Sequence, residues 1–198
     1  MQTFLAYDEF NESGRVLDPS RQNKQILETR QIMNVLYKKA HNLPVKGWAN
    51  HPAVLMWEGF EWALLQYGHD VFANFAERTR KSHKAFDNML AEHSEWADSR
   101  NTDQFPHWLG DDRLHSSHRT RLMHKGTLDI IRKAMPNRTW PKQRFSKELR
   151  DFTVEDVKFT CQLLDLCYGS VVEDSHYAQF GWSEKPGDDY IWPKDLAA

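Results

Sequence analysis

The stretch HSSHRTRLMHK, residues 115–125, gathers histidines and cations at one place in the chain. Such a group can hold a metal ion, bind phosphate, or form an ordinary solvated helix face. On a helix, His115 and His118 would share one face, which is a usable spacing for metal ligands. A closed zinc site needs two further ligands, and neither a cysteine pair nor an HExxH motif supplies them. We therefore expect no metal and no cofactor, and we favour contacts to phosphate.

The charge around this stretch is uneven. Residues 113–150 carry eleven Lys and Arg against Asp129 and Glu148, whereas the whole chain has a net charge of −2. A strongly basic region on an otherwise acidic chain is typical of a polyanion-binding face. A solvated basic stretch without a partner is the alternative, because a run of charge alone is weak evidence.

A second group of reactive side chains lies near the start of the chain. Arg21, Lys24 and Glu28 fall on one polar stripe of a helix, together with Gln31. Such a stripe can be a surface ion-pair network. In a groove, the same side chains could bind a phosphate and place an acid–base carboxylate beside an amine. Helix geometry leaves both interpretations open. The motifs GxSxG, GxxxxGK[ST] and GxGxxG are absent.

The stripe requires a helix, and the sequence predicts one that begins at Asp18-Pro19, with Asp18 as the N-cap. Its apolar side recurs at helical spacing, at Ile26, Thr29, Met33, Leu36 and Ala40.

The next helix opens within GWANHPAVLMWEGFEWALLQYG, residues 47–68, with Asn50 or His51 near the N-cap and Pro52 in the first turn. Its apolar residues predict a buried face, formed by Val54, Trp57, Ala63, Leu64, Tyr67, Val71 and Phe75.

The rest of the chain reads as two further helices separated by polar segments. A polar break covers residues 99–112, and a basic helix is expected over 113–134. A proline-containing loop follows at 135–145, then a helix at 153–168 and an irregular tail at 183–198. No alternating pattern indicates a strand, so we predict an all-α fold and a single compact domain over residues 1–198.

Composition agrees with a globular cytoplasmic protein. The chain has 198 residues, of which 40% are hydrophobic, and no apolar run approaches the length that spans a membrane. The opening MQTFLAYDEF lacks the basic and apolar regions of a signal peptide. Cys161 and Cys167 have neither a metal-binding nor a redox-motif spacing, and we interpret both as core thiols in a reducing compartment.

Several long blocks resemble a bacterial and phage family that is similar to the pyrimidine-dimer DNA glycosylases. The blocks occur in the family's order along most of the chain, and residues about 127–174 look like a helical insertion. They are LDPSRQNKQILETRQI (17–32), GWANHPAVLMWEGFEWALLQYG (47–68), FPHWLGDDRLHSSHRTRLMHK (105–125), HYAQFGW (176–182) and YIWP (190–193).

The resemblance implies an enzyme of the bacterial or phage-infected cytoplasm that binds duplex DNA and extrudes a nucleotide. An amine attacks the sugar C1′, forms a Schiff base and breaks the strand by β-elimination, with help from a glutamate on the first helix. The nucleophile would be the Met1 amine or Lys24, and Glu28 would be the carboxylate. An α-amine with a pKa near about 7.8 is neutral far more often at pH 7 than a lysine near about 10.4.

The other implied roles concern DNA contacts. His51 and His118 would position the sugar-phosphate, and Trp48 would stack on a displaced base. Phosphates would be bound by Arg21, Arg119, Arg121 and Lys125, within and beyond the basic face at 113–150.

Two departures from the family pattern favour an alternative reaction. Gln2 is large enough to keep Met1 in place, whereas the family's nucleophile is a threonine exposed after methionine removal. The helix position that best matches the family's glutamate falls near Lys24, one turn before Glu28. A DNA base-modifying transferase on the same scaffold would fit both departures, and a non-catalytic DNA-binding module is a third possibility.

Overall fold

The computed structural model describes residues 2–100, 103–134 and 191–196. The expected loop at 135–145, the expected helix at 153–168, Cys161 and Cys167 lie outside these residues. So does most of the expected insertion at 127–174.

The described residues are helical and contain no strand, which confirms the all-α prediction. The helices are α1 (Phe10–Arg15), α2 (Pro19–Ala40), α3 (Pro52–Leu55), α4 (Glu61–Thr79), α5 (Lys84–Asp98), α6 (Asp112–Ala134) and α9 (Pro193–Leu196). The chain divides into two compact units, of which the first comprises Met1–His115 and Ile191–Ala198 and the second Ser116–Tyr190. Among these helices, none is long and apolar enough to cross a membrane.

The start of α2 follows directly from its sequence. The Asp18 carboxylate accepts hydrogen bonds from the amides of Ser20 and Arg21, both at 3.0 Å, and Pro19 occupies the first turn. These contacts satisfy amides that have no partner inside the helix. The predicted apolar side is buried from Ile26 onwards, with the exception of Ala40, which is exposed at the end of the helix.

The second predicted helix is divided in two. His51 caps the short α3 as expected, but Gly59 has a φ of 86° and α4 begins only at Glu61. Because a positive φ cannot continue a right-handed helix, Gly59 separates α3 from α4. The face that the sequence predicted to be buried is buried in both helices.

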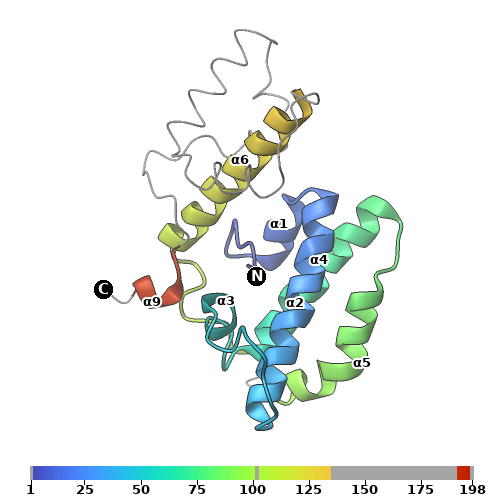
Figure 1. Ribbon diagram of the computed structural model, residues 1–198, viewed down its shortest axis with the longest axis vertical. Coiled ribbons are helices and arrows are strands. Elements are labelled where there is room, and N and C mark those ends of the chain that lie inside the picture. The colour runs from blue at the N-terminus through green and yellow to red at the C-terminus, as the bar shows by residue number, and fades with distance from the viewer. Residues whose placement is uncertain (1, 101–102, 135–190, 197–198) are drawn as a thin grey trace. The chain divides into compact units, whose positions relative to one another are not determined.

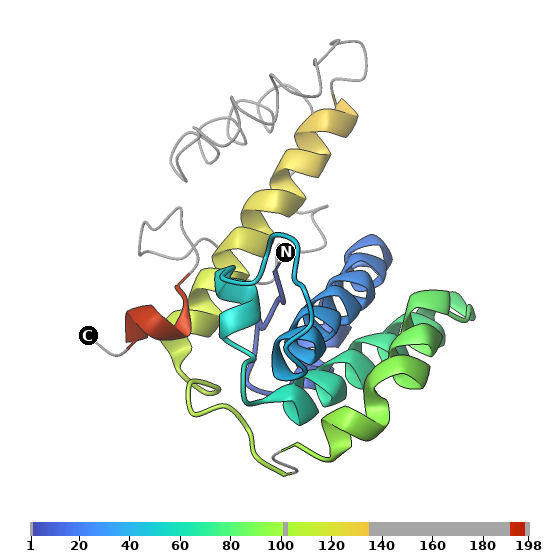
Figure 2. The ribbon, with the colours of Figure 1, turned by 60° about the horizontal axis from the view of Figure 1, so that its bottom comes forward.

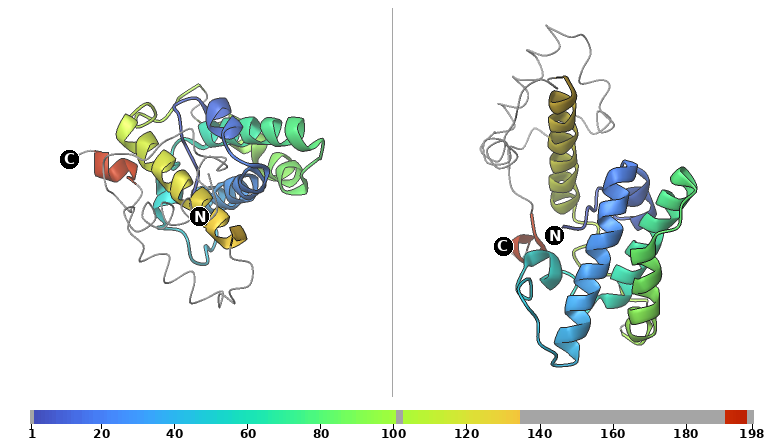
Figure 3. Two further views of the ribbon diagram at one scale, coloured as in Figure 1. Left: turned by 90° about the horizontal axis from the view of Figure 1, so that it is seen from above. Right: turned by 45° about the vertical axis from the view of Figure 1, so that its right-hand side comes forward.

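Helices α2, α4 and α5 pack against one another and form the main body of the first unit (Figures 1 and 3). Gly68 allows their close approach, because a Cβ there would lie 3.0 Å from Met89 Cε of α5 and 3.1 Å from Thr29 Cγ2 of α2. The short α3 packs against α2 (Figure 2). Helix α2 is therefore covered by other helices on more than one side.

The first residues of the chain are also part of the core. Residues 2–6, which we call the N-terminal segment, are non-helical and buried, and Thr3, Leu5 and Ala6 are fully so. The polar break before α6 and the basic helix over 113–134 are confirmed. The tail was predicted to be irregular, but it contains the short α9, whose Asp195 carboxylate accepts from the Trp192 amide.

Candidate active site

The N-terminal segment is held against α2 by one side chain, Gln25. Its Oε1 accepts a hydrogen bond from the Phe4 amide at 2.8 Å, and its Nε2 donates to the Gln2 carbonyl at 2.9 Å. The single hydrogen of the Tyr67 hydroxyl, on α4, is shared between the same Oε1 at 2.7 Å and the Phe4 carbonyl at 3.1 Å. Gln25 is completely buried, so these bonds form away from water.

The carboxylate of Glu28 lies at the beginning of this segment. Its Oε2 accepts from the Gln2 amide and from Gln25 Nε2, both at 3.2 Å. Only 9% of the residue is exposed. Hydrogen bonds from two donors offset part of the cost of burying this carboxylate. The geometry places a buried carboxylate beside the second residue of the chain.

The pKa of Tyr67 is affected by the charge of this carboxylate. Burial raises the pKa of Tyr67 well above its ordinary value, and the nearby charge of Glu28 raises it further, against a lowering by the hydrogen bond to Phe4. The Tyr67 hydroxyl is therefore a neutral hydrogen-bond donor at physiological pH.

Lys24 and Arg21 have different environments from Glu28 on the same helix. Lys24 is exposed, and its Nζ lies 3.9 Å from Glu28 Oε1. Arg21 forms a 2.6 Å ion pair with Asp18 at the start of the helix. Arg21 therefore pairs with Asp18 and Lys24 with Glu28, so the stripe does not form one ion-pair network, and Glu28 is not a surface residue.

A hollow of about 510 Å³ lies next to the start of α3, and both Trp48 and His51 line it. The Trp48 side chain is 54% exposed, and its backbone has a positive φ of 46°. The two rings meet edge to face, with centroids 4.9 Å apart. An exposed indole at the edge of a hollow can stack on a nucleobase.

His51 connects this hollow to the N-terminus. Burial lowers the pKa of His51, and the positive charge of the chain's N-terminal amine lowers it further. The His51 Nδ1 accepts from the Ala53 amide at 3.1 Å, which requires that this nitrogen be unprotonated. His51 is thus a neutral imidazole within the electrostatic range of the amine.

His115 does not take part in the phosphate contacts that the sequence favoured for the stretch 115–125. This residue is buried, its Nδ1 bonds the Leu5 carbonyl at 2.8 Å, and its Nε2 accepts from the Gly110 amide at 3.0 Å. Both ring nitrogens are therefore used to hold the N-terminal segment and the turn before α6. Among the described residues, no group of three or more side chains could hold a metal ion.

The other residues of the stretch 115–125 vary in exposure. His118 is completely buried, so its side chain does not reach the surface where a DNA phosphate would bind. Arg119 and Arg121 are half-buried, and Lys125 is exposed.

Within the same basic region, Arg113 pairs with Asp111 at 2.9 Å, and hydrogen bonds from Arg113 lower the pKa of that carboxyl group. Residues 135–150 of the predicted basic face lie outside the described residues.

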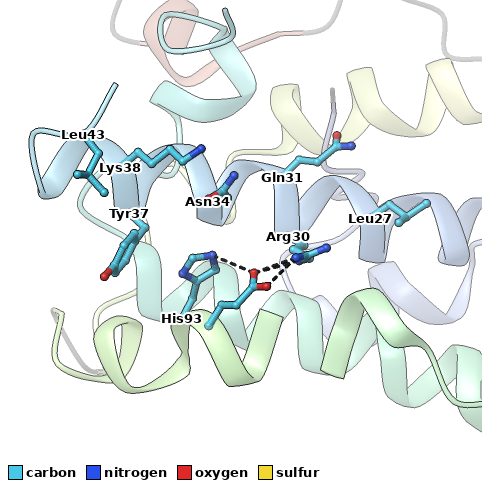
Figure 4. A pocket seen from close by; sticks show the side chains of 9 residues that line it. Leu27, Arg30, Gln31, Asn34, Tyr37, Lys38, Leu43 and His93 are labelled. Atoms are coloured by element: carbon cyan, nitrogen blue, oxygen red, sulfur yellow. Dashed lines mark hydrogen bonds and ion pairs between the residues drawn. The ribbon is translucent and has the colours of Figure 1, made fainter. Parts of the chain in front are cut away.

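A separate hollow of about 590 Å³ lies between α2 and α5 (Figure 4). The Arg30 guanidinium crosses it to the Glu92 carboxylate of α5 at 2.8 Å, and Tyr37 and His93 form its far end. None of the predicted site residues lines this hollow. The chemistry predicted from the sequence is therefore not located here.

Sequence reasoning missed Gln25 and treated Tyr67 and Trp57 only as core residues. Gln25 directly precedes the apolar Ile26 on the buried side of α2, and this position could have signalled a buried amide. The Trp57 indole donates to Thr3 Oγ1 at 3.0 Å, so it too holds the N-terminal segment.

The fold and the site define an all-α protein in which a buried carboxylate on α2, Glu28, contacts the second residue of the chain. Residues 1–88 match a protein family described as pyrimidine dimer DNA glycosylase, and the resemblance seen in the sequence is thereby confirmed for this segment. The segment contains Glu28, Gln25, Trp48 and His51. No curated protein and no solved structure matches the chain. For the blocks at 105–125, 176–182 and 190–193, the resemblance remains a prediction.

Proposed function

We propose that this protein is a DNA glycosylase and abasic-site lyase that uses an amine as its nucleophile. The observation that carries the proposal is the buried Glu28 carboxylate, 3.2 Å from the Gln2 amide. Covalent geometry keeps the amine of residue 1 within about 4 Å of the Gln2 nitrogen. The amine and the Glu28 carboxylate therefore lie within about 7 Å of each other, and rotation about the first residue can bring them closer.

The chemistry needs these two groups together. The neutral amine forms a bond to C1′ while the glycosidic bond breaks and its electron pair leaves with the base. Glu28 stabilises the positive charge that develops on the sugar and accepts the proton released by the amine. The C1′–O4′ bond then breaks, O4′ takes the proton held by Glu28, and the nitrogen lone pair forms the protonated Schiff base. A C2′ proton passes to the Glu28 carboxylate, its electron pair forms the C2′=C3′ double bond, and the 3′ phosphate leaves, which breaks the strand.

The N-terminal amine is a better nucleophile here than Lys24. Lys24 is exposed, and its Nζ lies 3.9 Å from Glu28 Oε1, so its ammonium is held in an ion pair at the surface. An α-amine has an ordinary pKa near about 7.8 and is partly neutral at pH 7. Trp48 at the edge of its hollow would stack on a displaced base, and His51 would contact the sugar-phosphate.

Borohydride trapping tests the proposal. The protein is incubated with duplexes that carry a cyclobutane pyrimidine dimer or an abasic site, and the covalent product is mapped by mass spectrometry. We expect a cross-link on residue 1 that persists in Lys24→Arg. A cross-link on Lys24 that disappears in this variant would reassign the nucleophile.

The same experiment distinguishes the alternative of a base-modifying transferase, which the retained Met1-Gln2 pair favours. Such an enzyme would change the mass of a base in intact DNA and give no trapped complex. Binding of DNA with neither cross-link, strand break nor base change would contradict both enzymatic functions and favour a binding module.

A further inference from the structure

We propose that Gln25 is a positioning residue that holds the first residues of the chain, and with them the N-terminal amine, beside the Glu28 carboxylate. This inference rests on the proposed function. In this inference, Gln25 does not contact the substrate. It brings the nucleophile and the carboxylate together.

The first support is that the Gln25 amide has no spare hydrogen-bonding capacity. An amide has two donors and an oxygen with two acceptor sites. The donors serve the Gln2 carbonyl at 2.9 Å and Glu28 Oε2 at 3.2 Å. The acceptor sites receive the Phe4 amide at 2.8 Å and the Tyr67 hydroxyl at 2.7 Å. A fully used, buried amide has one orientation and resists displacement.

The second support is that the partners themselves fix the direction of this amide. The Phe4 N–H can only donate and the Gln2 carbonyl can only accept, so a flipped amide would lose both bonds. Both backbone groups, two residues apart, therefore face the Gln25 amide. Gln25 therefore pairs with the N-terminal segment as a neighbouring strand would, and fixes its register along α2.

The third support is that other side chains hold the same segment from other sides. The Trp57 indole donates to Thr3 Oγ1 at 3.0 Å, and His115 bonds the Leu5 carbonyl at 2.8 Å. Gln25 differs from these two side chains because it bonds both the N-terminal segment and Glu28. A shift of about 1 Å between reacting groups can cost about 10²-fold in rate, so this shared contact is where a positional error would matter most.

The chain supplies a matched control in Gln22, one turn earlier on α2. Gln22 is also completely buried, and its Nε2 donates to the Gly14 carbonyl at 2.9 Å, remote from Glu28. Gln22→Met and Gln25→Met both replace a buried amide by an apolar side chain of similar length. Both are expected to lower thermal stability, so stability alone cannot separate a structural role from a positioning role.

The experiment compares the two variants in the full chain. For Gln25→Met we expect a single-turnover cleavage rate about 10²-fold lower at saturating dimer-containing duplex, with an unchanged Kd for DNA. Hydrogen exchange at the Phe4 amide should accelerate at least about tenfold, because its acceptor is lost. Gln22→Met should retain both the wild-type rate and the wild-type exchange at Phe4.

Gln25→Glu separates the two halves of the amide. Its carboxylate can still accept from Phe4 and Tyr67, but it cannot donate to Gln2 or Glu28. We expect protection of the Phe4 amide to persist in this variant while the cleavage rate remains low. Equal rates and equal exchange in Gln25→Met and Gln22→Met would overturn the inference. A wild-type protein that gives no trapped complex would overturn the proposed function instead, and the exchange measurement would still decide whether Gln25 holds the segment.

Discussion

Glu28 differs from an ordinary surface glutamate in what it contacts. Two donors, the Gln2 amide and Gln25 Nε2, converge on its Oε2, and the Lys24 ammonium is no closer than 3.9 Å. Neighbours that donate hydrogen bonds to a carboxylate fix its orientation. These contacts support the acid–base role that we propose for Glu28.

We predict that Glu28→Gln lowers the single-turnover cleavage rate by about 10²–10⁴-fold. The amide oxygen of glutamine can still accept both hydrogen bonds, so the melting temperature and DNA affinity should remain close to wild type. Glu58→Gln is the matched control, because Glu58 is exposed and pairs with Lys39 at 2.7 Å. Wild-type turnover in Glu28→Gln would contradict the catalytic assignment.

His51 leads to a prediction about pH. Its pKa is lowered from the ordinary value of 6.5 in the folded protein, so the folded state binds a proton less readily than the unfolded state. The stability contributed by neutral His51 is therefore fully present above pH 6.5 and is lost as the pH falls below that value. Protonation also places a hydrogen on Nδ1 and removes the cap of α3.

Asparagine is a strong N-cap that does not titrate in this range. We expect the difference in unfolding free energy between wild type and His51→Asn to shift against wild type as the pH is lowered from about 7.5 to about 5. Urea unfolding at several pH values measures this difference. A difference that is independent of pH would refute the assigned role of His51.

At the scale of the elements, Gly59 decides that α3 and α4 are separate helices. Its φ of 86° turns the chain, and the Gly59 amide donates to Glu61 Oε1 at 3.1 Å at the start of α4. No atom lies within 4 Å of the position that a Cβ would occupy. A larger residue would therefore be disfavoured by backbone conformation alone.

Gly59→Ala should lower the free energy of unfolding by about 1 kcal/mol. Gly59→Asn should cost less, because asparagine tolerates positive φ better than alanine does. Chemical denaturation of the three proteins gives the comparison. Equal stability of the alanine variant and wild type would mean that the turn does not require a positive φ.

At the scale of the whole molecule, the uneven charge of the chain predicts how it binds DNA. Reversal of Arg119, Arg121 and Lys125 to glutamate should weaken binding to every duplex sequence tested. The slope of log K against log salt concentration should become shallower by about 0.9 for each phosphate contact that is lost.

The control for this prediction reverses Arg15, Lys81 and Lys84, which are exposed residues of the first compact unit. It changes the net charge of the protein by the same amount outside the basic region. Equal losses of affinity in the two triple variants would show that net charge, rather than the region 113–150, determines binding. Fluorescence anisotropy over a range of salt concentrations is sufficient.

The sequence by itself determined the helical class, the start of α2 and the apolar faces of α2 and α4. These features depend on neighbours within a few residues, such as Asp18 and the first amides of its helix, and on a period of 3.6 residues. The sequence also placed Glu28 on a stripe with Lys24, and its resemblance to a glycosylase family identified both as candidates for chemistry.

Only the tertiary structure decided which side of that stripe is covered. The bonds from Gln2, Phe4 and Tyr67 to α2 join residues more than 20 positions apart, and His115 reaches Leu5 across 110 positions. Helical periodicity describes how side chains are distributed around one helix. It carries no information on whether a distant segment lies against a polar face, because that depends on how the whole chain packs. For this reason Gln25 became visible only in the fold, whereas Glu28 was visible in the sequence.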